Sequence, residues 1–102
     1  FSLKYLTGGE DFFGGEGVVH TVTRAGFSEE CPNLGKLFGQ MDFSLEMENG
    51  IMGQILDDGA DPDEATMEWI KANGETVMGW VDGVSTEDGG DGAAAVKEAF
   101  GL

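Results

Sequence analysis

The alternation of apolar and polar residues near the N-terminus predicts one β-strand. Residues 18–24 are rich in β-branched side chains, with Val18 and Val22 on one face and Val19 on the other. No other segment has so clear a strand pattern, and a single strand cannot form a sheet by itself. Three sources of a pairing strand are possible. It is a segment of this sequence with a weak strand pattern, a strand of another copy, or a part of the protein that is absent from this sequence.

The residues before this strand predict a loop rather than a regular element. Residues 1–17 read as a short apolar segment followed by a glycine-rich stretch that carries Phe12 and Phe13. Paired phenylalanines in such a loop are typical of side chains that plug a core. We therefore expect both rings to be buried.

Helical signals dominate from residue 27 onward. Pro32 is acceptable in the first turn of a helix, and Ser44 is a suitable cap for a helix that runs to about Asp57. The strongest local signal is Asp61 followed by Pro62, which predicts an N-cap and the first helical position.

Two further short helices are expected over residues 75–81 and 92–100. The predicted fold class is therefore α/β, with mostly short helices and one clear strand. Residues 1–102 form a single unit, with a loop and strand in 1–26 and a helical part in 27–102.

Composition restricts the classes of partner. The 102 residues contain 5 Lys plus Arg against 20 Asp plus Glu, which gives a formal net charge of -15. Such a charge repels phosphate backbones and anionic lipid surfaces, so nucleic acid and membrane partners are disfavoured. No stretch has the roughly 18 to 20 apolar residues that span a bilayer. The chain begins at Phe1, so it looks like a processed or excised chain.

The candidates for catalysis are weak. A nucleophilic triad needs Ser or Cys with His and a carboxylate, and His20 and Cys31 are the single residues of their kinds. Neither lies in a recognisable motif, and a lone cysteine excludes an internal disulfide or a multi-cysteine zinc cage. We expect no enzyme activity and no cofactor.

Two acidic, glycine-containing segments resemble calcium loops only in composition. They are residues 57–63 and 87–92, and neither has the alternating ligand spacing or the distal glutamate of an EF-hand. Helix capping and turn chemistry explain Asp61, Asp63 and Asp91 without a metal ion. We therefore predict no metal site.

Three aromatic residues are candidates for a ligand box. Trp69, Trp80 and Tyr5 could together hold a quaternary ammonium group by cation–π attraction. Both tryptophans, however, lie at apolar positions of predicted helices, which favours core packing. The three residues remain weak candidates for ligand binding.

A series of short motifs resembles one protein family. They occur in the order Arg24-Ala25-Gly26-Phe27, Cys31-Pro32-Asn33, Phe43, Met47-Glu48-Asn49-Gly50-Ile51-Met52, Asp61-Pro62-Asp63-Glu64-Ala65, Trp69-Ile70-Lys71-Ala72-Asn73 and Trp80-Val81-Asp82-Gly83-Val84. Their order and spacing resemble the C-terminal part of the glycine betaine/choline/proline betaine class of substrate-binding proteins of ABC importers. The resemblance covers nearly the whole chain and is firmest over residues 18–84.

This resemblance implies a fold, a function and a location. Members of the class are two-lobed periplasmic binding proteins of type II-like architecture, which close on a methylammonium compound and deliver it to a membrane permease. They are well over twice as long as this chain, so the resemblance implies a C-terminal fragment of a periplasmic or other extracytoplasmic protein. The aromatic box of the class lies on earlier segments, and the tryptophans that match Trp69 and Trp80 look structural.

Under a second hypothesis, the chain is an autonomous acidic helical domain that binds a protein partner or calcium. The two hypotheses differ in the surface that they predict. A fragment of an importer protein should expose apolar surface and so should form a homodimer or exchange its N-terminal strand. An autonomous domain should be a stable monomer.

Overall fold

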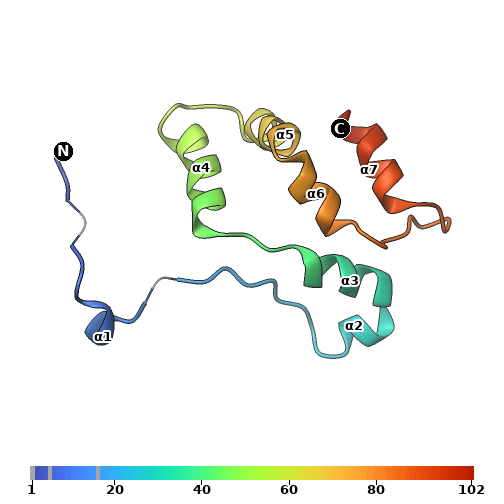
Figure 1. The fold of residues 1–102 in the computed structure, drawn as a ribbon, viewed down its shortest axis with the longest axis horizontal. Helices are drawn as coiled ribbons and strands as arrows, with labels where there is room; N and C mark the ends of the chain where they lie inside the picture. The colour runs from blue at the N-terminus through green and yellow to red at the C-terminus, as the bar shows by residue number, and fades with distance from the viewer. Residues whose placement is uncertain (1, 5, 16) are drawn as a thin grey trace.

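The computed structural model describes residues 2–4, 6–15 and 17–102, and it is mostly helical (Figure 1). The seven helices of these residues are α1 (Glu10–Phe13), α2 (Phe27–Glu30), α3 (Pro32–Gln40), α4 (Leu45–Leu56), α5 (Pro62–Ala72), α6 (Gly74–Trp80) and α7 (Gly92–Phe100). No helix among them is both long enough and apolar enough to cross a membrane.

Local capping chemistry explains where the main helices begin. The Met47 N–H donates to Ser44 Oγ (3.1 Å) at the start of α4. The Asp61 carboxylate accepts from the Asp63 N–H (2.9 Å) and the Glu64 N–H (3.3 Å) at the start of α5. The predicted caps are therefore confirmed, and Pro32 begins α3 as expected.

The helices from α2 onward form a small body around four buried side chains. Contacts join α2 to α3, α3 to α6, α4 to α5, and α5, α6 and α7 to one another. Ala65 of α5, Val77 of α6, and Val81 and Val84 of the following loop are the buried apolar residues. The core therefore lies where α5 and α6 meet the chain that leads to α7.

Residues 2–4, 6–15 and 17–22, which we call the N-terminal arm, lie largely apart from this body (Figure 1). Within the described part of the chain, α1 contacts none of the other helices. Phe12 and Phe13 contact each other edge to face, with ring centroids 4.9 Å apart, and both are exposed. The prediction that they plug a core is therefore wrong, because no other helix of the described residues contacts α1.

The predicted strand over residues 18–24 is not formed. These residues are irregular, Val18 and Val22 are exposed, and the only bridge in the described residues is an isolated one between Ser85 and Asp91. A β-branched sequence becomes a strand only when a neighbouring strand pairs with its backbone, and the described part of the chain supplies no such strand. The one clear strand of the predicted α/β fold is therefore not confirmed, whereas the predicted predominance of short helices is found in the residues described.

Candidate functional site

The largest aromatic cluster joins three segments of the body. Trp80, at the end of α6, stacks on Trp69 of α5 with ring centroids 5.8 Å apart and an angle of 15° between the rings. Phe43, which precedes α4, lies 4.9 Å from Trp80 at an angle of 42°. All three side chains are half-buried. The cluster therefore ties α5, α6 and the start of α4 together.

The spacing within this cluster restricts what it can bind. Centroids 5.8 Å apart are typical of two rings in direct contact. A quaternary ammonium group enclosed between two ring faces would need space for its methyl groups between them. The facing sides of Trp69 and Trp80 offer no such space, since the two rings are in contact with each other. Tyr5, the third candidate, lies outside the described residues.

Two amide side chains of α3 hold the loop between α6 and α7. Asn33 donates from Nδ2 to the Ser85 carbonyl (2.7 Å) and accepts at Oδ1 from the Ser85 N–H (2.8 Å). Gln40 donates from Nε2 to the carbonyls of Trp80 (2.6 Å) and Asp82 (3.1 Å). These bonds connect segments that are 40 to 52 residues apart in the chain, so they fix the position of Trp80 relative to α3.

We expect Asn33→Ala to loosen this loop. The substitution removes both bonds to Ser85 and should lower the local opening free energy by about 1.4 kcal/mol, which corresponds to about tenfold faster exchange of the Ser85 amide. Hydrogen exchange measured by NMR checks this. Asn49→Ala on α4 is the control, because Asn49 is exposed and should leave the Ser85 exchange rate unchanged.

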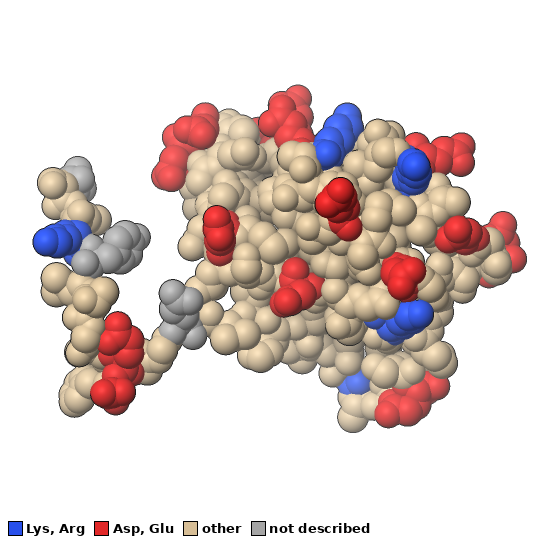
Figure 2. Space-filling model, viewed as in Figure 1, with Lys and Arg blue, Asp and Glu red and all other residues tan. Residues whose placement is uncertain are grey.

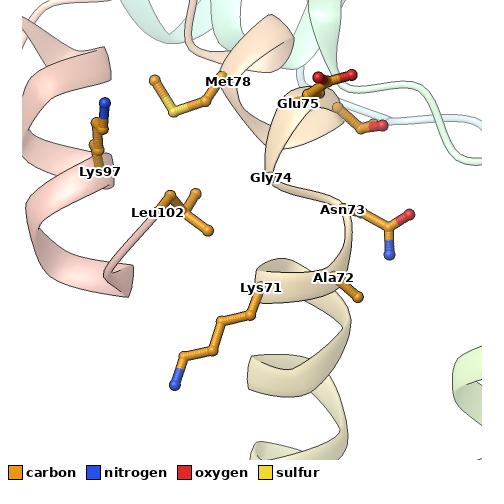
Figure 3. Close-up of a pocket in the computed structure, with 9 residues that line it drawn as sticks. Lys71, Ala72, Asn73, Gly74, Glu75, Met78, Lys97 and Leu102 are labelled. Atoms are coloured by element: carbon orange, nitrogen blue, oxygen red, sulfur yellow. The ribbon is translucent and has the colours of Figure 1, made fainter.

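One hollow lies between α7 and the junction of α5 and α6 (Figure 3). Its volume is about 820 Å³, and two of the five cationic residues of the chain, Lys71 and Lys97, line it. Their side chains point in opposite directions, and Leu102 lies between the helices, where a Cβ atom added at Gly74 would be 3.3 Å from Leu102 Cδ2 (Figure 3). The two ammonium groups therefore do not converge on one ligand position.

Two more hollows lie along α4. The larger, of about 790 Å³, is lined by residues 17–19 of the N-terminal arm, residues 42–46 and Asn49. The smaller, of about 320 Å³, is lined by Phe43, Glu48, Ile51 and Met52. The smaller hollow is mainly apolar. This side of α4 therefore has room for an apolar group.

Acidic side chains are spread over the visible face of the protein rather than gathered at one point (Figure 2). Within the described residues, no three His, Cys, Asp or Glu side chains are close enough together to hold a metal ion. The Asp61 carboxylate caps α5, and the Asp91 carboxylate caps α7 by accepting from the Ala93 N–H (3.0 Å). His20 is exposed on the N-terminal arm, and Cys31 is half-buried at the start of α3.

The turn over residues 86–90 has one carboxylate with a perturbed pKa. The hydroxyl of Thr86 and the N–H of Gly90 both donate to Asp88, and they hold the pKa of this carboxyl below its usual value. A lowered folded pKa contributes stability above the unfolded pKa. That stability is lost as the pH falls through the folded pKa.

Thr86→Val should therefore raise the pKa of Asp88 towards its ordinary value, because the hydroxyl donor is removed and the side-chain shape is kept. An NMR titration of the Asp88 carboxyl checks this. Thr76→Val, at an exposed position of α6, is the matched control and should not move this pKa. An unchanged Asp88 titration in Thr86→Val would mean that the hydroxyl bond has no effect.

Sequence reasoning predicted some of these contacts and missed others. It placed Trp69 and Trp80 in packed positions but did not pair Trp80 with Phe43. It also missed Asn33 and Gln40, although their spacing of seven residues places them on one face of a helix. Two amides on one helical face were the available signal, but their backbone partners lie 40 to 52 residues away, too far along the chain for local patterns to reveal.

Comparison with known protein families defines the class of this helical unit. Residues 1–72 match the substrate-binding domain of the ABC-type glycine betaine transport system. The chain belongs to this family of transport substrate-binding proteins. The resemblance found in the short motifs is thereby confirmed.

Particular relatives agree with this class. The chain is 34% identical over 89 residues to the glycine betaine/carnitine transport binding protein GbuC of Listeria monocytogenes serotype 1/2a. It is 47% identical to an ABC-transporter choline binding protein solved with choline, at a TM-score of 0.77 over 98% of this chain. An unliganded, semi-closed structure of an ABC-transporter choline binding protein gives 52% identity and the same TM-score over 100% of this chain.

The chain is much shorter than these relatives. It spans 29% of the Listeria protein and 36% of each solved choline-binding chain. The chain thus corresponds to about a third of each whole protein.

Proposed function

We propose that this chain is part of the substrate-binding component of an ABC importer for quaternary ammonium solutes such as glycine betaine, choline or proline betaine. The observation that carries the proposal is the similarity of nearly the whole chain to solved choline-binding proteins, at 47% and 52% identity. Its role is binding and delivery of a solute rather than catalysis. Choline leads among the solutes, because both solved relatives are described as choline binding proteins.

The partner of this component is the membrane permease of the importer, and the binding takes place on the outer side of the membrane, in a periplasm or another extracytoplasmic space. Membership of the transport family supports this arrangement. The net charge of -15 is also compatible with a partner that offers basic groups, since opposite charges speed encounter.

The aromatic groups that surround the solute lie, in this proposal, outside residues 1–102. The direct contact between Trp69 and Trp80 supports this placement, because each ring already has an aromatic neighbour on one face. Phe43 occupies a further position beside Trp80. These three residues then act by holding the helical body in shape.

The experiment that tests the function uses a chimera, in which these 102 residues replace the matching 36% of the choline-binding relative. Calorimetric titration should show binding of choline and should show at least tenfold weaker binding of 3,3-dimethylbutanol, its neutral isostere, because cation–π attraction needs the positive charge. Equal binding of both compounds, or no binding of choline by a folded chimera, would contradict the proposal.

A further inference from the structure

The first turn of α4 is closed by two hydrogen bonds between Ser44 and Met47. The Met47 N–H donates to Ser44 Oγ (3.1 Å), and the Ser44 N–H donates to Met47 Sδ (3.5 Å). This reciprocal pair is a capping box, in which the third helical residue is ordinarily Glu or Gln. The acceptor for the Ser44 N–H is therefore a thioether sulfur, at a position where an oxygen is usual.

The sulfur is the weak half of this cap. A thioether sulfur is a poor hydrogen-bond acceptor. Within the described part of the chain, it is nevertheless the acceptor that the Ser44 N–H finds. The N-terminus of a helix has a partial positive charge, so an oxygen with partial negative charge would bind this N–H group more tightly. The start of α4 thus lacks one strong acceptor.

Oxidation of the sulfur supplies such an acceptor. A lone pair of Met47 Sδ attacks one oxygen of hydrogen peroxide, an S–O bond forms and the O–O bond breaks. The other oxygen leaves as water after a proton transfer, so the sulfur loses two electrons and the peroxide gains them. The new sulfoxide oxygen is bonded directly to the atom that already accepts from the Ser44 N–H.

Met47 differs from the more exposed methionines in what its sulfoxide oxygen would meet. Met52 is 44% exposed and lines the smaller, mainly apolar hollow, and Met67 is 37% exposed. Among the described residues, Met47 is the methionine whose sulfur accepts a backbone hydrogen bond. Its side chain is half-buried, so part of it is open to a molecule as small as hydrogen peroxide.

We propose that Met47 is a modification site, at which oxidation to the sulfoxide strengthens the N-terminal cap of α4. Oxidation of methionine ordinarily disturbs apolar packing, whereas here the added oxygen completes a capping box. The capped residue, Ser44, directly follows Phe43, whose ring contacts Trp80, so the modified side chain also holds the aromatic cluster at the start of α4. This inference goes beyond the proposed function and does not depend on the solute that is bound.

The test treats the 102-residue chain with hydrogen peroxide and follows two quantities together. Peptide mass mapping measures the oxidation of each methionine, and NMR measures the hydrogen exchange rate of the Ser44 amide. The exchange should slow by about fivefold as Met47 is oxidised, because the Ser44 N–H gains a stronger acceptor. Reductases for both sulfoxide epimers should restore the original rate.

Met47→Leu is the matched control, because it keeps the size of the side chain but has no sulfur. The Ser44 amide of this variant should exchange at one rate before and after peroxide, although Met52 and Met67 are still oxidised. Met47→Gln places an amide oxygen at the same position of the capping box. Without peroxide, its Ser44 amide should exchange about fivefold more slowly than in the unmodified protein.

Three results would overturn the inference. In the first, Met47 stays reduced after Met52 and Met67 are fully oxidised. In the second, Met47 is oxidised but the Ser44 amide exchanges as fast as before or faster, so the sulfoxide oxygen does not bind the N–H group. In the third, Met47→Gln leaves the exchange of the Ser44 amide unchanged, so an oxygen at this position does not strengthen the cap.

Discussion

Trp80→Ala is expected to lower the free energy of unfolding of this chain by about 3 kcal/mol. The Trp80 ring contacts both Trp69 and Phe43, so its removal takes away the contacts that join α5, α6 and the start of α4. Urea unfolding followed by circular dichroism checks this result. A variant that is already unfolded without urea would also agree with the prediction, because its loss of stability would be even larger.

Leu56→Ala is the matched control for this substitution. Leu56 is also a large apolar side chain in a helix, but it is 75% exposed, so its truncation should change the stability by less than about 0.5 kcal/mol. Equal losses in the two variants would show that the aromatic cluster does not organise the body.

Gly92→Ala is expected to destabilise the protein by about 2 to 3 kcal/mol. Gly92 is buried, and its N–H donates to the Val84 carbonyl at 2.9 Å. A Cβ atom at this position would lie 2.5 Å from that same carbonyl oxygen. The backbone must therefore move apart, which breaks the hydrogen bond and shifts Val84, one of the buried apolar residues.

Gly50→Ala provides the opposite expectation in the same measurement. Gly50 lies inside α4, and a Cβ atom there would meet nothing within 4 Å. Because alanine loses less conformational freedom than glycine in a helix, this variant should gain about 0.5 to 1 kcal/mol. Stabilisation by both substitutions would contradict the close approach of Gly92 to Val84.

Local chemistry explains which elements could be predicted from the sequence. Ser44 and Asp61 accept hydrogen bonds from N–H groups within three residues, and Pro32 needs only its own ring geometry to begin a helix. Each of these features depends only on residues within about one helical turn. The helices that begin at these residues were accordingly predicted well.

The elements that failed depend on distant partners. Residues 18–24 have strand composition, but a strand also needs a second strand, which the described residues do not supply. Phe12 and Phe13 have the character of core residues but lie on an arm without a covering layer. The bonds of Asn33 and Gln40 were missed for the same reason, because their acceptors are 40 to 52 residues away.

The proposed function places the aromatic groups that surround the solute outside these 102 residues. Calorimetric titration of choline into the 102-residue chain and into the chimera, side by side, tests it most directly. We expect binding heat from the chimera and none from the chain alone. Binding of comparable affinity by the chain alone would contradict this placement of the aromatic groups. Trp69, Trp80 and Tyr5 would then be the candidates for the ligand-binding residues.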